Sequence, residues 1–337
     1  MLCVLLLVSV LSVQVVPGPA PKPPVRGLGP QDAAWIDDAQ LITLAELDRY
    51  LATVYARKPE GQQALLQVLQ EAIVEREAAQ RKLVVTEAEV DGALIALDKQ
   101  TGGLDRALSA DVDGASLRNI VRLHLLQERL VRDARQLRPL DPVPPDELKS
   151  WMEERLKDAA LAEAPLDDAR AATWAGGELG KQRVGARLRA VLDKDDVAGV
   201  LTEMIATQLV RRRADEMGLQ ITPAAVTEEI LQRNTALQAH SGGLQVNYAQ
   251  YLEQIEHRSL QELIASDVFN TEVLARLITE QLWTEDQARA YWERNKAAFE
   301  SHGPKGEWEQ VRYAVWKDIR FAVCNDLYAK SRILRRY

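Results

Sequence analysis

The chain has 337 residues, which is long enough for two ordinary domains. Ala, Leu, Glu, Arg and Gln are abundant and aromatic residues make up only 5% of the chain, a composition that favours helices packed on helices. The net charge of −8 argues against a nucleic-acid-binding protein, as does the shortness of basic runs such as Arg211–Arg213, which acidic residues closely follow.

The N-terminus begins with an uncharged apolar run over residues 1–16, and six prolines follow between residues 17 and 30. The run has the length of a signal-sequence core and is shorter than the about 20 residues that a membrane-spanning helix needs. No Lys or Arg precedes it, and Pro21 follows Ala20, the one obvious small cleavage residue, so cleavage and anchoring both stay open. We expect an exported protein, periplasmic or otherwise extracytoplasmic, with residues 1–16 as a candidate membrane tether.

The central feature of the sequence is an internal repeat. The segment 64–90 matches 200–226 at a constant offset of 136 residues, and both segments predict a long helix with a threonine near its exit. The Trp-led segment 35–51 matches 174–192, and the Gly-Gly-Leu at 102–104 matches the one at 242–244. Further on, Ser116-Leu117 matches Ser259-Leu260 at an offset of 143, and the segment from Pro144 resembles that from Thr284. Five matching segments in the same order indicate two copies of one helical module.

The first copy predicts a short hairpin followed by helices. Two aspartates at 37–38 between apolar pairs predict a turn. Thr43 and Thr86 each precede a glutamate by three residues, the spacing of a capping box, which predicts a helix start. Apolar spacing predicts a long helix over about 62–82. Four apolar residues mark a further helix: Ile120, Leu123, Leu126 and Leu130.

Prolines between 137 and 145 predict a break, with a last helix of the first copy over 146–156. In the second copy Thr222 and Pro223 have the residue types of a helix cap and a first helical position. Its helices are expected over 201–217, 224–238, 259–282 and 285–299. A four-residue apolar period predicts one C-terminal amphipathic helix after residue 307, with Ile333 and Leu334 in a short closing strand.

No motif for catalysis or ligand binding is present in the sequence. The four histidines (His124, His240, His257 and His302) have no helical pairing, and we interpret them as structural. The glycine pairs lack the strand and lysine of a phosphate loop, and the two cysteines, Cys3 and Cys324, form no CxxC pair. We therefore expect no catalytic residue, no metal site and no cofactor.

Three segments are similar to the N-terminal module of SurA, PrsA and related periplasmic foldases: Ile42–Asp48, Leu83–Val90 and Ser116–Ile120. The helix from Pro145 to Trp151 also resembles this family's exit helix, and Val311–Tyr337 resembles its closing helix and strand. The resemblance covers most of residues 34–337 and implies a periplasmic chaperone or foldase. Relatives usually carry a parvulin domain between modules, but residues 157–173 are too few to hold one. The resemblance therefore implies no isomerase active site.

The predicted fold is all-α with a minor β hairpin and strand. It comprises two SurA-N-like helical lobes over residues 31–160 and 161–300, and a C-terminal helix and strand over 301–337, after the signal-like segment and tether of residues 1–30. Aromatic residues at helix ends are interpreted either as core or as a cradle for unfolded peptide, since aromatics supply contact area at low entropic cost. The candidate peptide-binding residues are Tyr50, Tyr55, Trp151, Tyr291 and Trp292.

The leading hypothesis is an ATP-independent holdase or foldase-like chaperone that binds unfolded or extended extracytoplasmic client polypeptides in a cleft between the two lobes. A structural or adaptor protein that binds one dedicated partner is the second hypothesis. A divergent peptidyl-prolyl cis-trans isomerase is the third, and activity on a test peptide would reveal it.

Overall fold

The computed structural model describes residues 27–37, 39–101, 114–138, 141–161, 169–240, 247–299 and 308–337. These residues are mostly helical with a few short strands, so the expected all-α class with minor β structure is confirmed. The chain divides into two compact units. The continuous unit holds residues 45–197, and the discontinuous unit holds residues 1–44 and 198–337.

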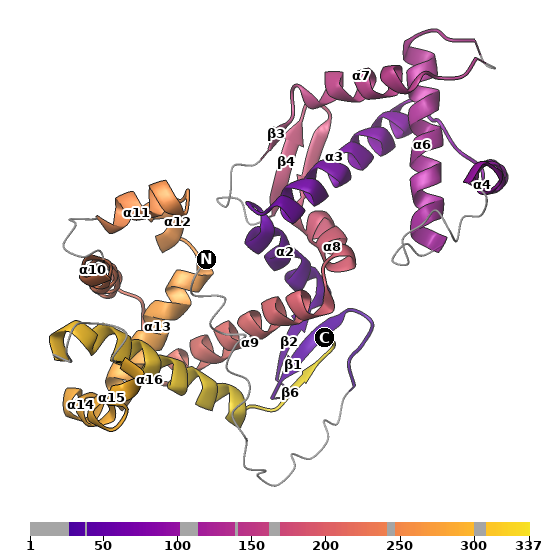
Figure 1. The fold of residues 1–337 in the computed structure, drawn as a ribbon. Helices are drawn as coiled ribbons and strands as arrows, with labels where there is room; N and C mark the ends of the chain where they lie inside the picture. Colours follow the sequence, from indigo (N-terminus) through magenta and orange to yellow (C-terminus); the bar gives the residue numbers. More distant parts are fainter. Residues whose placement is uncertain are drawn as a thin grey trace. The chain divides into compact units, whose positions relative to one another are not determined.

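The continuous unit is built around one long helix, α3 (Pro59–Gln80). In Figure 1, α3 lies with α6, α7 and α8 beside it, and all three helices contact it. Val68, Leu69, Ile73 and Val74 of α3 are buried, so its apolar stripe forms the centre of this unit. The other elements are α2 (Leu44–Tyr55), α4 (Glu87–Thr101), α6 (Gly114–Ala134), α7 (Pro145–Leu156), β3 (Ala160–Leu161), β4 (Arg170–Trp174), β5 (Gly177–Gly180) and α8 (Lys181–Val191).

The backbones of α2 and α8 approach each other at Gly185. A Cβ atom added to Gly185 would lie 1.7 Å from the carbonyl oxygen of Asp48, so only glycine fits at this point. The Asp48 side chain is buried and accepts a 2.7 Å hydrogen bond from Nε of Arg189 on α8. The sequence therefore provides both the close approach and an ion pair that orients the two helices.

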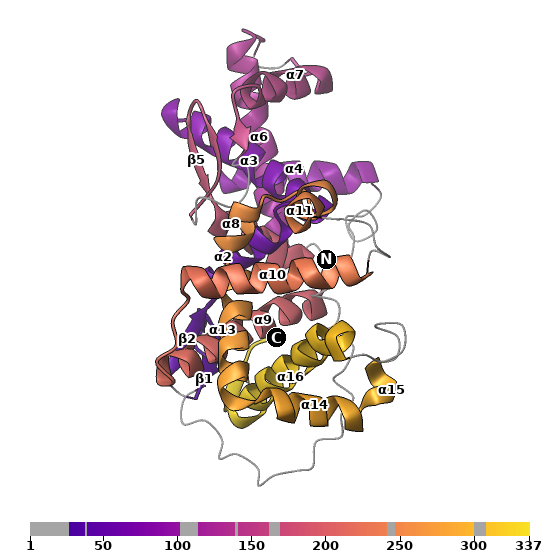
Figure 2. The ribbon, with the colours of Figure 1, turned by 90° about the vertical axis from the view of Figure 1, so that its left-hand side faces the viewer.

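The discontinuous unit is organised by α16 (Trp308–Lys330), which contacts α10, α13, α14 and α15. Figure 2 shows α10, α13, α14, α15 and α16 after a 90° turn from the view of Figure 1. Its elements are β1 (Asp32–Ile36), β2 (Gln40–Thr43), α9 (Lys194–Glu216), α10 (Pro223–His240), α11 (Tyr248–Ile255), α12 (Leu260–Ile264), α13 (Asp267–Leu282), α14 (Glu285–Arg294), α15 (Lys296–Phe299), α16 and β6 (Ile333–Arg335). Separate apolar clusters join α14 and α15 to α16, α9 to α13, and α10 to α11, α12 and α13.

The two sheets follow one plan, in which a hairpin is extended by a strand that follows a helix. In the discontinuous unit the order is β2-β1-β6, and Ile36 pairs with Ile333. In the continuous unit the order is β3-β4-β5, and Thr173 pairs with Ala160. The closing strand that the sequence predicts near Ile333 is confirmed.

The two compact units differ from the two lobes that the sequence predicts, because those lobes are consecutive in sequence and meet at residue 160. The β4–β5 hairpin and α8, which begin the second repeat, lie in the unit that holds the helices of the first repeat. Conversely, the β1–β2 hairpin of the first repeat lies in the unit that holds the helices of the second. The reason is strand pairing: β3 ends the first repeat and pairs with β4, while β6 ends the chain's last helical segment and pairs with β1. The repeats thus exchange their hairpins.

Helix starts agree with the sequence where a cap was visible. The Thr86 backbone N–H donates to the Glu89 carboxylate at 2.8 Å and Thr86 Oγ1 accepts from the Glu89 N–H, so this capping box is confirmed. Thr222 Oγ1 accepts from the Ala225 N–H at 3.2 Å, as expected. The single helix expected over 259–282 is wrong, because Ser266 caps α13 and separates it from α12. The glycine pairs and residues 1–26 lie outside the described residues.

Candidate functional site

The helices α4 and α6 pack against each other and form what we call the α4–α6 arm. Ion pairs between them show that they run antiparallel: Glu87 contacts Arg122 and Arg118, and Asp91 contacts Arg118 at 2.7 Å. This register carries the later residues of α4 toward the start of α6. Leu94, one turn beyond Asp91 on α4, is therefore brought near Leu117, the first described side chain of α6.

The first part of α6 carries large apolar side chains that the described part of the chain leaves at least partly exposed. Six large apolar residues precede Leu130, and none of them is classed as buried, whereas Leu130 and Val131 are fully buried. We define the arm surface as Leu94 of α4 with Leu117, Ile120 and Val121 of α6. Ile120 is 49% exposed, and the other three side chains are half-buried. The arm surface is an apolar region bordered by ion-paired charges.

Most of the aromatic residues expected to bind peptide lie in the core. Trp151 is completely buried with the Arg155 guanidinium 3.7 Å from its ring, and Tyr55 and Trp292 are also buried. The reason is that each lies on the inward face of its helix, where a large side chain closes the packing. The expectation that these three present themselves to a client is therefore not met in this structure. Tyr50 and Tyr291 are half-buried, and the Tyr291 hydroxyl donates to Asp318 at 2.6 Å.

Tyr291 and Trp292 belong to one aromatic cluster between α14, α15 and α16. The ring of Tyr291 meets those of Trp283 and Phe299 edge-on, and Trp292 packs on Trp308. Burial, together with the hydrogen bond to Asp318, raises the pKa of Tyr291 to about 12. The aromatic pattern of the sequence thus marks helix packing at these positions.

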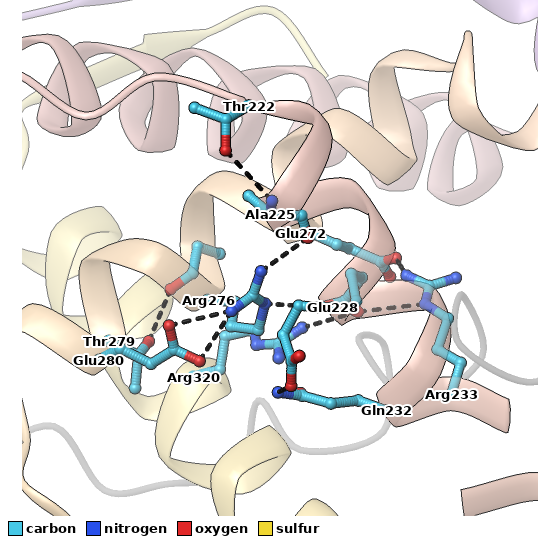
Figure 3. Close-up of polar contacts among 12 residues, drawn as sticks. Thr222, Ala225, Glu228, Gln232, Arg233, Glu272, Arg276, Thr279, Glu280 and Arg320 are labelled. Atoms are coloured by element: carbon cyan, nitrogen blue, oxygen red, sulfur yellow. Dashed lines mark hydrogen bonds and ion pairs between the residues drawn. The ribbon is translucent and has the colours of Figure 1, made fainter. Parts of the chain in front are cut away.

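A buried charge network, which the sequence did not reveal, links α10, α13 and α16. Glu229 of α10 has no exposed surface and contacts three arginines: Arg233 at 3.1 Å, Arg276 at 3.1 Å and Arg320 at 3.3 Å. Figure 3 shows Arg233, Arg276 and Arg320 converging from the three helices. Glu272 pairs with Arg233, and Glu280 pairs with Arg276 at 2.8 Å, so three acids balance three bases.

The network keeps its charges although water does not reach Glu229. Burial acts to raise the pKa of Glu229, but attraction to Arg320, Arg233 and Arg276 and a hydrogen bond from Arg233 hold that pKa below its ordinary value. Burial likewise raises the pKa of the neighbouring Tyr313 to about 12. The only sequence signal for this network is a polar residue facing inward on an otherwise apolar stripe. We assign it to holding the three helices together.

A hollow of about 320 Å³ lies between α3, α7 and the turn of the β4–β5 hairpin. Trp174, Arg76, Asp158 and the buried Ile73 line it, along with Arg155, which pairs with Glu77. The hollow is small and mixes charges of both signs, and it offers no continuous apolar wall. Among the described residues, no group of three or more His, Cys, Asp or Glu side chains is placed to hold a metal ion. His124, on α6, is exposed and lies 3.4 Å from Glu128.

No protein-family model, no curated protein and no solved structure matches the chain. Within the described ranges, no helix is both long enough and apolar enough to span a membrane.

Proposed function

We propose that the chain is an extracytoplasmic, ATP-independent chaperone that holds unfolded or extended polypeptides on the arm surface, without prolyl isomerase catalysis. The observation that carries this proposal is the start of α6, where six large apolar residues precede the first buried one. An apolar surface with a polar rim is the ordinary chemistry of a polypeptide-binding surface.

The size of the arm surface fits weak, reversible capture. Full burial of one Leu, Ile or Val side chain contributes about 1.5–3 kcal/mol. The four residues of the arm surface are only partly exposed, and association itself costs several kcal/mol, so binding is expected in the micromolar range or weaker. A holdase needs such affinity, because it must release its client without a nucleotide cycle.

Two features of the sequence support the class and compartment in this proposal. The segments that resemble the SurA and PrsA modules include Leu83–Val90, which leads into α4, and Ser116–Ile120, which lies in the first turns of α6. The apolar run of residues 1–16 and the proline-rich tether are typical of an exported chain. Client polypeptides would then be extracytoplasmic.

The test is light scattering from reduced, denatured lysozyme diluted into buffer, with and without the full chain. Suppressed scattering at stoichiometric ratios, together with no acceleration of prolyl isomerisation in a tetrapeptide assay on the same preparation, is the expected result. Unchanged scattering would contradict the chaperone proposal. Catalysed isomerisation would instead support a divergent isomerase.

An adaptor protein for one dedicated partner is the second candidate. The burial of Tyr55, Trp151 and Trp292 favours it, because fewer aromatics are left to capture varied clients. An adaptor would leave lysozyme scattering unchanged and would retain one protein in stoichiometric amount from an extract of its own cell envelope.

A further inference from the structure

The internal repeat gives the hollow beside Arg76 an equivalent position in the discontinuous unit. The constant offset of 136 places Arg76 of α3 at the position of Arg212 of α9. The Arg212 guanidinium donates to the Asp37 carboxylate at 2.5 Å and lies 3.9 Å from the Glu216 carboxylate. The backbone N–H of Arg332 donates to the same Asp37 carboxylate at 2.6 Å. In the discontinuous unit this arginine therefore pairs with a carboxylate that the hairpin turn supplies.

Uncharged residues replace both of these acids around Arg76. Gly176, in the turn of the β4–β5 hairpin, takes the position of Asp37 when the two Trp-led segments are matched. Gln80 takes the position of Glu216 at the offset of 136. Both replacements line the hollow of about 320 Å³. Arg76 is exposed there, and within the described part of the chain it has no carboxylate partner.

The N–H donors of two side chains lie close together at the hairpin turn. A Cβ atom added to Gly176 would lie 2.7 Å from Nε1 of Trp174 and 3.3 Å from Nε of Arg76, so both nitrogens are near one point. A Cβ atom added to Gly177 would lie 2.7 Å from Nη1 of Arg76. Neither glycine has a positive φ, so the backbone of the turn does not require glycine. Their missing side chains instead leave room for the guanidinium and the indole.

The acids that line the hollow do not satisfy these donors. Glu77 is paired with Arg155, and Glu154 is paired with Arg135 at 2.8 Å. Asp158 is exposed and has no ion pair with any described residue. Its charge opposes the binding of an anion and therefore limits the affinity, because like charges repel.

We propose that this hollow binds a carboxylate of a polypeptide, which pairs with Arg76 as the Asp37 carboxylate pairs with Arg212. The guanidinium provides charge-assisted N–H donors, and the Trp174 indole N–H, which donates to no described atom, provides one more. The buried Ile73 also lines the hollow and offers an apolar contact. The volume is at the lower end for ligand pockets, so one side chain or one chain terminus suits it.

This inference goes beyond the proposed function, because the hollow shares no residue with the arm surface. The discontinuous unit provides the argument for a polypeptide ligand, since the carboxylate that occupies the equivalent position belongs to an aspartate of the chain itself. The same chemistry can come from an Asp or Glu side chain or from a C-terminus, and the test distinguishes these two sources.

The test follows the Trp174 indole N–H signal in a proton–nitrogen correlation spectrum of the isotope-labelled full chain. Trp174→Phe assigns the signal, because it alone removes it. The probe is the peptide acetyl-Ala-Ala-Leu with a free C-terminal carboxylate. It is expected to shift the signal saturably with a dissociation constant of about 1 mM, because one exposed arginine provides most of the attraction. The same peptide with a C-terminal amide is expected to bind at least about tenfold more weakly.

Three protein variants test the roles of the charged residues. Arg76→Gln is expected to weaken binding of the free acid at least about tenfold, because it removes the cation. Arg138→Gln is the matched control: it removes an exposed arginine outside the hollow and should leave the affinity within about twofold. Asp158→Asn should strengthen binding about twofold, because it removes the like charge. Circular dichroism melting of each variant checks that the fold is retained.

Several outcomes would overturn the inference. They are the absence of a saturable shift, equal binding of the acid and the amide, unchanged binding by Arg76→Gln, and an equal loss in Arg138→Gln. Weaker binding by Asp158→Asn would also overturn it, because Asp158 would then hold a cationic ligand.

A third peptide, acetyl-Ala-Asp-Leu with a C-terminal amide, identifies the source of the carboxylate. Binding as tight as that of the free acid supports a site for carboxylates of either source. Weaker binding, with the free acid still bound, supports a site for C-termini. The lysozyme assay tests the chaperone proposal alone, so failure of one proposal is distinguishable from failure of the other.

Discussion

At the scale of single residues, Glu229 shows how a charge is kept in a protein interior. Its carboxylate has no exposed surface, yet three guanidinium groups lie within 3.3 Å of its oxygens. Such a pair adds little net stability over a well-packed apolar replacement, because both ions lose hydration. Loss of one partner is a different matter, since the remaining charges stay buried and uncompensated.

Glu229→Gln is therefore expected to lower the free energy of unfolding by about 3–5 kcal/mol, because Arg276 and Arg320 would lose their shared counter-ion. Glu280→Gln is the matched control: its side chain is 39% exposed, and the change should cost less than about 1 kcal/mol. Urea denaturation followed by far-ultraviolet circular dichroism measures both. Equal losses would show that Glu229 is not the centre of the network.

The same residue predicts a pH dependence with a defined sign. The pKa of Glu229 in the folded protein is held below its ordinary value, so the unfolded chain binds the proton more readily. Its contribution to stability is complete above about pH 4.3, the ordinary glutamate pKa, and is lost as pH falls through the lower folded value. Melting temperatures between pH 3 and pH 7 should fall less steeply for Glu229→Gln than for wild type. Parallel curves would contradict this assignment.

The position of aromatic residues could be predicted from sequence only in part. The sequence indicates that these aromatic residues lie at helix ends. The burial of each ring, however, depends on which neighbouring helix faces it. Trp151 and Tyr291 have similar local sequence, yet one is completely buried and the other is half-buried. The buried network was equally hidden, because its pairs join residues 47 and 91 positions apart along the chain.

At the scale of secondary-structure elements, capping residues in the sequence predict helix starts correctly, whereas apolar patterns do not predict where one helix ends and the next begins. The starts of α4 and α10 follow from Thr86 and Thr222, since a cap acts on the next three residues. The break between α12 and α13 was missed because both segments are apolar on one face. Ser266 decides the break by accepting from the Phe269 N–H, a bond that competes with continued helix.

The approach of α2 to α8 gives an element-scale prediction. Gly185→Ala would place a methyl group 1.7 Å from the Asp48 carbonyl oxygen, so the two helices must separate. A loss of at least about 2 kcal/mol in unfolding free energy is expected, in line with the cost of overpacking. Gly199→Ala on α9 meets no atom within 4 Å and should instead stabilise by about 0.5–1 kcal/mol. Thermal and urea denaturation of both variants would show whether the signs are opposite.

At the scale of the whole molecule, sequence order does not define the compact units. The repeat was visible, but a repeat shows which segments are alike and not which of them pack together. The strand pairs β1–β6 and β3–β4 join each hairpin to the helices of the other repeat, and the packing of α8 on α3 adds to this. The sequence therefore predicts a boundary near residue 160. Similarity between segments carries no information about the exchange of hairpins.

Leu334→Pro tests the exchange directly. Asp37 donates to Arg332 and Arg336 donates to Ala33, so the two-residue alternation of an antiparallel ladder directs the Leu334 N–H toward β1. Proline removes that donor and should open the β2-β1-β6 sheet. Hydrogen exchange is expected to accelerate in residues 32–43 and in neighbouring segments of the discontinuous unit, with little change in residues 45–161. Acceleration in α3 or α6 instead would argue for units in sequence order.

The hairpin exchange also determines the order in which the protein can fold during synthesis. The β1–β2 hairpin is among the first described elements to leave the ribosome, yet the Asp37–Arg332 contact beside its closing strand spans 295 residues. The continuous unit lies between these two segments and can form while the hairpin still lacks its partner. The open edge of β1 is then a pairing surface for other nascent chains until β6 has been synthesised. Slow translation of α16 would lengthen the time for which the edge of β1 is exposed. The rate of elongation would then affect the yield of folded protein.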